Sequence, residues 1–140
     1  MVFELHVSEW LNSDKALGLT DFHGRVLAVE VFQMLCPGCV SHGLPQMQRI
    51  AQTFAKEDVA VIGLHSVFEH HAAMTPVSLR AFLHEYRITF PVAVDAPGTG
   101  PMPHTMAAWG LEGTPTLLLF DRQGQVRARH FGTVPDMGLG

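Results

Sequence analysis

The chain has 140 residues, 47% of them hydrophobic and 16% charged, which suffices for the buried core of one ordinary domain. Thirteen acidic residues against nine Lys and Arg give a formal charge of −4 without a basic cluster, which argues against nucleic-acid binding. The apolar runs are far shorter than the roughly 18 residues of a membrane span, so we expect no membrane association.

The first predicted strand covers Val26–Phe32, a β-branched and nearly continuous apolar run of the kind found in doubly buried strands. The sequence Cys36-Pro37-Gly38-Cys39 follows this strand and opens a predicted helix. Apolar residues recur on one face of that helix, namely Leu44, Met47, Ile50, Ala51 and Phe54. A second buried strand is predicted over Val59–Leu64.

The second half of the chain repeats this alternation of strands and helices. Thr75 and Pro76 are typical of a helix start, and the apolar face of that helix is Leu79, Phe82, Leu83 and Tyr86. The later elements are a strand over Phe90–Val94, a loop over residues 96–103, a helix over Thr105–Trp109 and a hairpin of Thr116–Phe120 with Val126–Phe131. This order predicts one α/β domain over residues 1–140, a sandwich on a mixed sheet with a terminal antiparallel hairpin. Residues 1–19 would be an N-terminal extension and residues 132–140 a short tail.

The two cysteines of the chain, Cys36 and Cys39, are three positions apart, at the junction between a predicted strand and a predicted helix. The free N–H groups of the helix start would favour a thiolate at Cys36, and Pro37 suits the first helical turn. Cys39 should be more buried and placed to attack a disulfide formed at Cys36. The alternatives are two structural cysteines or half of a zinc site, although a closed zinc site needs four ligands.

Glu30 interrupts the first apolar strand, so its carboxyl should point into a buried face of the sheet with Ala28 and Phe32. Burial raises the pKa of a carboxyl because the charged form loses its hydration. Such a group beneath Cys39 could accept the proton of that thiol during resolution. The alternative places Glu30 at a solvated edge of the sheet.

Pro115 stands directly before a predicted buried strand and follows Gly113-Thr114, so Thr114–Pro115 is a candidate cis peptide bond. A cis bond would turn the Thr114 backbone toward the cysteines, where its N–H and C=O could pair with an extended peptide. A trans turn is the alternative. Together with Pro37 and Gly38, Thr114 and Pro115 are the candidate substrate-binding residues.

The strand with Glu30, the Cys36–Cys39 motif and Thr114-Pro115 together resemble the thioredoxin superfamily, and more narrowly its redoxin branch. That branch includes TlpA-like thiol–disulfide oxidoreductases and, more distantly, peroxiredoxins. The resemblance implies a thioredoxin-like three-layer sandwich, with Cys36 as nucleophile, Cys39 as resolving cysteine, Glu30 as buried acid and Pro115 as cis-proline. It implies no cofactor beyond the redox-active Cys36–Cys39 disulfide. The implied partners are a protein thiol or disulfide substrate and an electron donor.

Three features of the sequence depart from the family pattern. Leu35 replaces the aromatic residue that commonly precedes the first cysteine, and Pro45 follows Cys39 by six residues where five are usual, which predicts a shifted helix kink. The usual C-terminal helix is not expected, because only nine residues follow Phe131. Either the segment Phe3–Leu19 covers the sheet face concerned, or an apolar patch is left there, for which we expect a homodimer.

Two of the nine histidines belong to the region of the cysteines. His42 is one helical turn beyond Cys39, and His65 follows the second strand at the edge where reactive groups collect. Either could tune thiol ionisation near neutral pH or act with the two thiolates as a metal ligand, whereas the simpler alternative is a surface histidine. We expect no metal site.

The sequence therefore predicts an enzyme that exchanges disulfides with a protein partner. A peroxiredoxin-like thiol peroxidase is an alternative, but the Thr and Pro that precede the peroxidatic cysteine of that family are absent from the residues before Cys36. A copper- or zinc-binding protein is the second alternative. No signal peptide is visible, so we expect a cytoplasmic protein, or a periplasmic one if residues precede Met1.

Overall fold

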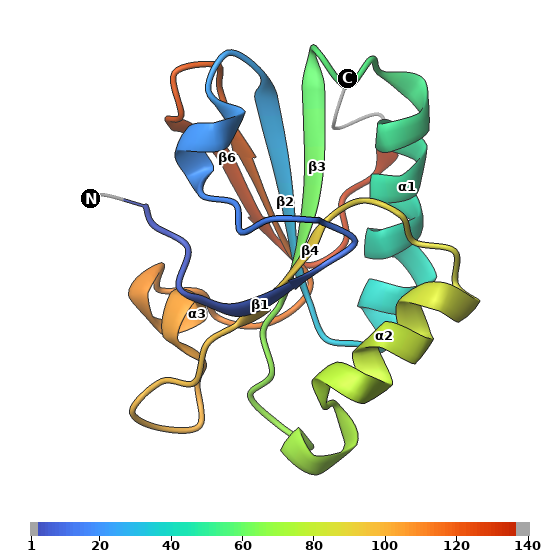
Figure 1. The fold of residues 1–140 in the computed structure, drawn as a ribbon, viewed down its shortest axis with the longest axis vertical. Coiled ribbons are helices and arrows are strands. Elements are labelled where there is room, and N and C mark those ends of the chain that lie inside the picture. Colours follow the sequence, from blue (N-terminus) through green and yellow to red (C-terminus); the bar gives the residue numbers. More distant parts are fainter. Residues whose placement is uncertain (1–2, 137–140) are drawn as a thin grey trace.

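The structure is a computed structural model that describes residues 3–136, and a six-stranded mixed sheet runs through its centre (Figure 1). The strands are β1 (Val7–Leu11), β2 (Val26–Phe32), β3 (Val59–His65), β4 (Val92–Asp95), β5 (Thr116–Phe120) and β6 (Val126–Phe131). Their order across the sheet is β1-β4-β3-β2-β5-β6. The central strands β2, β3 and β4 are parallel, whereas β1, β5 and β6 pair antiparallel with their neighbours. The predicted mixed sheet with its terminal hairpin is confirmed.

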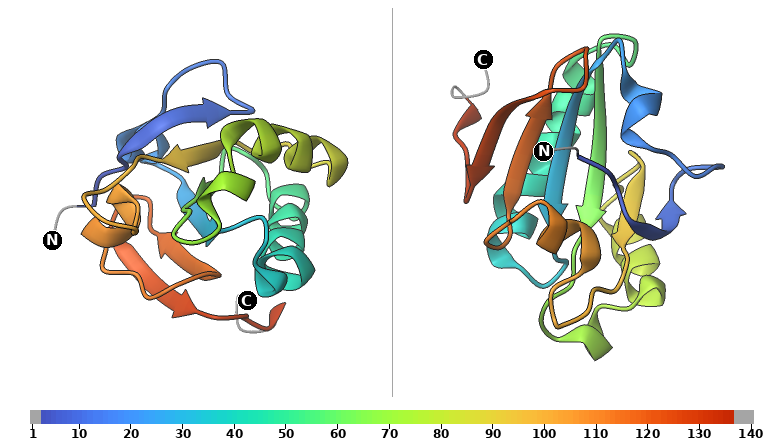
Figure 2. Two further views of the ribbon diagram at one scale, coloured as in Figure 1. Left: turned by 90° about the horizontal axis from the view of Figure 1, so that it is seen from below. Right: turned by 90° about the vertical axis from the view of Figure 1, so that its left-hand side faces the viewer.

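Helices cover both faces of the sheet and make the predicted three layers (Figure 2). One face carries the π-helix η2 (Cys39–Gly43), which runs into α1 (Leu44–Thr53), and the helix α2 (Pro76–Glu85). The other face carries the 3₁₀ helix η1 (Leu19–Phe22) and the short α3 (His104–Ala108). A further 3₁₀ turn, η3 (His71–Ala73), leads into α2, whose start is capped by the Thr75 hydroxyl accepting from the Ser78 N–H.

The buried strand β2 separates two apolar clusters because its side chains alternate between the faces. Ala28 and Phe32 point toward α1 and α2, whereas Leu27, Val29 and Val31 point toward η1 and α3. All of these side chains are buried, as expected for a central strand covered on both sides.

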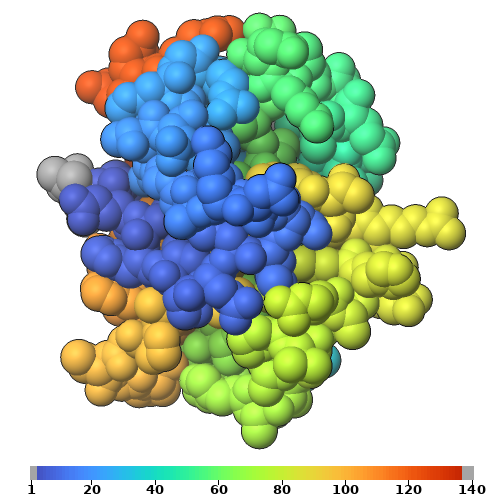
Figure 3. All heavy atoms as spheres, in the orientation of Figure 1, coloured from blue at the N-terminus to red at the C-terminus, as the bar shows by residue number. Residues whose placement is uncertain are grey.

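The N-terminal segment, predicted as an extension, is part of the sheet and covers one of its faces. Strand β1, which the sequence analysis missed, pairs with β4 at the sheet edge. The Phe3 ring packs edge-on against Trp109 and Phe120, with ring centres 5.3 and 5.7 Å apart, and the Trp109 indole donates to the Glu4 carbonyl. Figure 3 shows this segment in dark blue across the front of the molecule. The N-terminal segment therefore covers the face that also carries η1 and α3. A homodimer stays a prediction from the sequence.

Two residues assigned to buried helix faces lie elsewhere. Phe54 and Tyr86 follow the last residue of α1 and α2, and their side chains are 51% and 53% exposed. The apolar periodicity thus continues one residue beyond each helix. Within residues 3–136, no helix has both the length and the apolar character needed to cross a bilayer.

The predicted tail begins directly after β6. Residues 132–136 of the tail contain no α-helix. The last residues of the tail, 137–140, lie outside the described part of the chain. Val134 is nevertheless buried, in the cluster that also contains Leu44 and Met47 of α1.

Candidate active site

Cys36 lies at the carboxyl end of β2, where the chain turns into a helix. The Cys36 N–H donates to the Gln33 carbonyl at 3.0 Å and closes this turn, and helical geometry begins at Pro37. The Cys36 carbonyl accepts from the N–H groups of Cys39 and Val40, both at 3.1 Å. Cys36 thus precedes the first helical residue, next to N–H groups with no partner inside the helix.

The two thiols differ in exposure. Cys36 is half-buried, whereas Cys39 has no exposed surface, and both are free. Burial raises the pKa of the Cys39 thiol, and its hydrogen bond to Cys36 raises that pKa further. Cys39 therefore keeps its proton until a nearby base removes it, while Cys36 can be reached from solvent.

The four candidate substrate-binding residues lie together beside Cys36. The Thr114–Pro115 peptide bond is cis, and the Cys36 thiol donates to the Thr114 carbonyl with Sγ and O 3.6 Å apart. A Cβ on Gly38 would lie 3.4 Å from Cδ of Pro115, so the two residues are in contact. Pro37 lies between Cys36 and Gly38 in the sequence, and its side chain is exposed.

Glu30 is buried within the sheet, and its carboxyl faces the helix that begins with the cysteines. Its side chain is 2% exposed, so the alternative of a solvated edge is wrong. Desolvation, and after it the negative charge of Cys36, raises the pKa of Glu30 from 4.5 to about 8. A methyl group on Gly43 would lie 3.1 Å from Cδ of Glu30, which locates the carboxyl against the end of η2.

The extra residue between Cys39 and Pro45 is accommodated as a π-turn. The Leu44 N–H donates to the Cys39 carbonyl five residues earlier, where an α-helix would use a residue four earlier. The helix becomes regular again from Leu44, with Pro45 in its first turn. The departure noted in the sequence is therefore a widened turn, and Gly43 stands where this turn meets Glu30.

His65 lies close to the site. It is 1% exposed, and desolvation lowers its pKa to about 4, so it is neutral at physiological pH. Its Nε2 accepts the Met34 N–H at 3.2 Å. A neutral buried ring engaged in this way holds the turn before Cys36, and the tuning of thiol ionisation by His65 stays a prediction.

Gln33 is a functional-site residue that the sequence analysis missed. It is buried directly after β2, and its carboxamide donates to the Thr114 hydroxyl at 3.4 Å and accepts the Phe68 N–H at 3.1 Å. It thereby connects the cysteine turn, the cis-proline loop and the segment after β3. The signal that could have revealed it is a polar side chain directly after a nearly continuous apolar strand.

His42 contacts the C-terminal segment. Its Nε2 donates to the Val134 carbonyl at 2.5 Å, and the buried Gln46 amide donates to the same carbonyl at 2.7 Å and to Asp136 at 2.9 Å. The Gly132 N–H donates to the Pro115 carbonyl, and Thr133 lies near Gly38. Residues 132–136 therefore form one side of the site, which sequence periodicity did not indicate.

The structure does not assemble the metal site considered as an alternative. Within residues 3–136, no three His, Cys, Asp or Glu side chains are grouped so that they could hold a metal ion. Nε2 of His65 and Nε2 of His42 are engaged with the backbone groups of Met34 and Val134.

Comparison with known proteins places this geometry among thiol-exchanging proteins. The family model named Redoxin matches residues 7–137. The crystal structure of a thioredoxin-like superfamily protein has a TM-score of 0.95 and 58% identity, over 97% of this chain and 88% of that one. The structure of a thiol-disulfide isomerase from Corynebacterium glutamicum has a TM-score of 0.95 and 51% identity, over 99% and 90%.

The similarity to curated relatives is lower. The thiol-disulfide oxidoreductase ResA of Bacillus thuringiensis is 26% identical over 112 residues, which are 80% of this chain and 58% of that protein. The thioredoxin-like protein YneN of Bacillus subtilis is 24% identical over 124 residues, or 89% and 66%. The chain thus spans less than two thirds of the length of these relatives.

Proposed function

The chain belongs to the Redoxin family and has the thioredoxin-like fold, and from this premise we propose that it is a thiol–disulfide oxidoreductase acting on a protein partner. The observation that carries the proposal is the pairing of a half-buried Cys36 with a fully buried Cys39 hydrogen-bonded to it. Thiol–disulfide exchange needs such a pair, an accessible attacking sulfur and a shielded second one.

In the first step, the Cys36 thiolate attacks one sulfur of a substrate disulfide. A bond forms between that sulfur and Cys36, the substrate disulfide breaks, and the other substrate sulfur leaves as a thiolate that takes a proton from water. The cis-proline loop lies beside Cys36, so a substrate strand could pair with the Thr114 backbone.

In the second step, Cys39 attacks Cys36 and releases the second substrate thiolate, which leaves the protein with a Cys36–Cys39 disulfide. Glu30 is suited to accept the Cys39 proton because of its charge coupling to Cys36. Burial is the main cause of the raised Glu30 pKa and an anionic Cys36 raises it further, and formation of the mixed disulfide removes that second contribution. The pKa of Glu30 then falls, the carboxyl ionises, and it can act as the base.

The proposed partners are a protein with an accessible disulfide and a dithiol electron donor that restores the reduced Cys36–Cys39 pair. The same steps in reverse would oxidise a substrate dithiol. A cytoplasmic location stays a prediction from the sequence.

The test mixes the reduced protein with a synthetic peptide that contains an intramolecular disulfide and follows the products by mass spectrometry. We expect the parent protein to release reduced peptide and to end with a Cys36–Cys39 disulfide. Cys39→Ser should accumulate the peptide as a mixed disulfide on Cys36, and Cys36→Ser should react no faster than a model thiol. Reactivity retained in Cys36→Ser, or full turnover by Cys39→Ser, would refute the proposal.

The same Cys39→Ser variant also separates the peroxidase alternative. Challenge with hydrogen peroxide should produce sulfenic acid at Cys36 no faster than at a model thiol of similar exposure. Peroxide reduction far above that rate, together with no mixed disulfide, would favour the peroxidase.

A further inference from the structure

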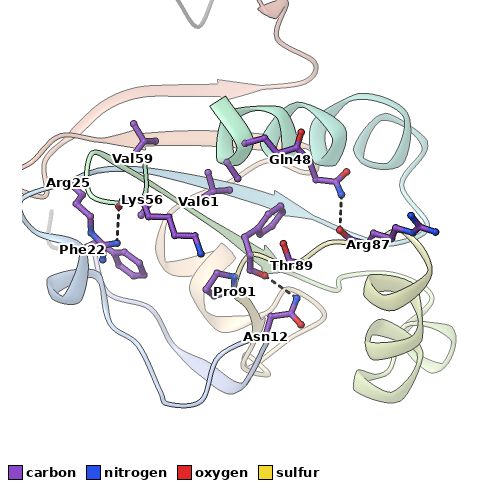
Figure 4. A pocket seen from close by; sticks show the side chains of 14 residues that line it. Asn12, Phe22, Arg25, Gln48, Lys56, Val59, Val61, Arg87, Thr89 and Pro91 are labelled. Carbon is purple, nitrogen blue, oxygen red and sulfur yellow. Dashed lines mark hydrogen bonds between the residues drawn. The ribbon is translucent and has the colours of Figure 1, made fainter. Parts of the chain in front are cut away.

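A hollow opens at the end of the sheet opposite the cysteines, where β3 begins (Figure 4). It has a volume of about 370 Å³ and lies between the second half of α1, the start of β3 and residues 87–91 before β4. Because β2 and β3 run in parallel over seven paired residues, this end is about 20 Å from the end that carries Cys36. The hollow is therefore separate from the proposed active site.

The charge of the lining is one-sided. Arg25, Lys56 and Arg87 line the hollow, three of the nine Lys and Arg residues, and none of the 13 acidic residues does. Among the described residues, none of these three cations forms an ion pair, whereas four of the other six do. A chain with a net charge of −4 thus gathers uncompensated positive charge in one concave place.

Arg25 and Lys56 are held differently in the hollow. Arg25 is held over the Phe22 ring, 5.1 Å from its centre, and donates to the carbonyls of Asp21 and Lys56. Its guanidinium is thus fixed before any ligand arrives. The Lys56 side chain extends into the hollow in Figure 4, and within the described residues its ammonium has no hydrogen-bond partner. Arg87 lies at the rim.

The floor of the hollow is apolar, and its rim is held in shape. Val61 and Phe90 are buried and form part of the floor. The Asn12 carboxamide donates to the carbonyls of Ile88 and Phe90, and the Gln48 carboxamide donates to those of Tyr86 and Arg87. These bonds fix the segment before β4, so the hollow does not have to be assembled by a ligand.

We propose that this hollow binds a small organic anion, with its phosphate or carboxylate group on Lys56 and Arg25 and a flat apolar body against Val61 and Phe90. An apolar floor with a few convergent charged groups is the usual composition of a small-molecule site. The apolar floor also lowers the local dielectric, which strengthens the attraction between the cations and an anion.

The test titrates the reduced chain of residues 1–140 with 1-naphthyl phosphate by isothermal calorimetry and maps the site by backbone NMR shifts. We expect one molecule bound, shifts centred on Val61 and Phe90, and an affinity that falls as salt is raised, because added ions screen the attraction. 1-Naphthol, the neutral counterpart, and inorganic phosphate alone should each bind at least about tenfold more weakly.

Charge-removing variants test the assignment of the cations. Lys56→Gln and Arg25→Gln should each weaken 1-naphthyl phosphate binding about tenfold. Arg127→Gln removes the same charge from an exposed position on β6 outside the hollow and should leave the affinity unchanged. Equal binding of 1-naphthol, equal weakening by Arg127→Gln, absence of binding, or shifts centred on Cys36 would each overturn the proposal. Because the double variant Cys36→Ser with Cys39→Ser should still bind, the result does not depend on the proposed redox function.

Discussion

Gly43 lies directly against the carboxyl of Glu30, so that a methyl group at Gly43 would overlap Oε2 and lie 3.1 Å from Cδ. The backbone of Gly43 is ordinary right-handed helix, with φ −60° and ψ −54°, so its conformation does not call for glycine. Glycine is needed here for space. The π-turn and the buried carboxyl are therefore two parts of one arrangement.

Gly43→Ala should destabilise the protein by about 1–3 kcal/mol, because the added methyl group forces the Glu30 carboxyl or the helix to move. Chemical denaturation at pH 7 measures the loss. Gly100→Ala is the matched control, because a Cβ there meets no atom within 4 Å, and it should change stability little.

A double-mutant cycle identifies the partner of that methyl group. In a Glu30→Ala background the carboxyl is gone, so the additional loss caused by Gly43→Ala should shrink to a small fraction of its value in the parent. An equal loss in both backgrounds would show that some other contact is responsible.

Glu30→Gln should change how stability depends on pH. The Glu30 pKa rises from 4.5 to about 8 on folding, so between these values the unfolded chain has released a proton that the folded chain still holds. The parent therefore loses stability as pH rises through this window, by about 3–5 kcal/mol relative to Glu30→Gln. Urea denaturation of both proteins at pH 4.5, 6 and 8.5 measures the difference, and parallel profiles would contradict the raised pKa.

Glu30→Gln should also separate the two chemical steps. The first attack by Cys36 does not use the carboxyl as a base, so its rate should change less than threefold or so, whereas release of the substrate by Cys39 should slow by about 10²-fold or more. Rapid-quench detection of the mixed disulfide measures both rates. If Glu30 were only structural, the two rates would fall together.

His65→Gln should remove an acid-sensitive contribution to stability. Burial lowers the His65 pKa from 6.5 to about 4. As pH falls through this range, the unfolded chain is protonated at His65 whereas the folded chain is not. The parent should lose about 3 kcal/mol between pH 6.5 and 4 from this residue, and Glu30 opposes part of that loss where the two windows overlap. The Gln variant keeps an acceptor for the Met34 N–H and should lack the loss.

His65→Leu provides the contrast. It leaves the buried Met34 N–H without its acceptor, which should cost about 1–3 kcal/mol at neutral pH. If His65→Gln retained the acid loss of the parent, another group would have to be its source.

Gln46→Ala and Arg49→Ala should differ although both side chains contact Asp136. Gln46 is buried and donates to the Val134 carbonyl, so its removal should cost about 1–3 kcal/mol and speed hydrogen exchange at Gly132. The Arg49–Asp136 pair is exposed, so Arg49→Ala should cost less than about 0.5 kcal/mol. Equal losses would mean that the C-terminal segment is held mainly by the surface ion pair.

The elements predicted correctly are those whose signal is local. The buried runs at Val26–Phe32 and Thr116–Phe120 became β2 and β5 because continuous apolar stretches need cover on both faces. The start of α2 followed from Thr75-Pro76. The position of Cys36 at a helix start and the burial of Glu30 also followed from strand and helix patterns alone.

The features that were missed depend on distant parts of the chain. Strand β1 is a short, half-exposed edge strand that exists by pairing with β4, more than 80 residues later. The neutral role of His65 depends on the Met34 N–H, and that of His42 on the Val134 carbonyl. None of these contacts has a periodicity that a single sequence displays.

The widened turn between Cys39 and Gly43 has a consequence for how related chains are compared. Each helical residue turns the chain by about 100°, so an added residue would normally rotate the thiols away from the face that packs on the core. Here the π-turn absorbs the added residue within one turn. The thiols therefore keep their orientation, and α1 keeps its apolar face on the core. An alignment should therefore place the gap inside residues 40–43, and a transplant of the cysteine motif into a relative without this turn would misdirect its sulfur atoms.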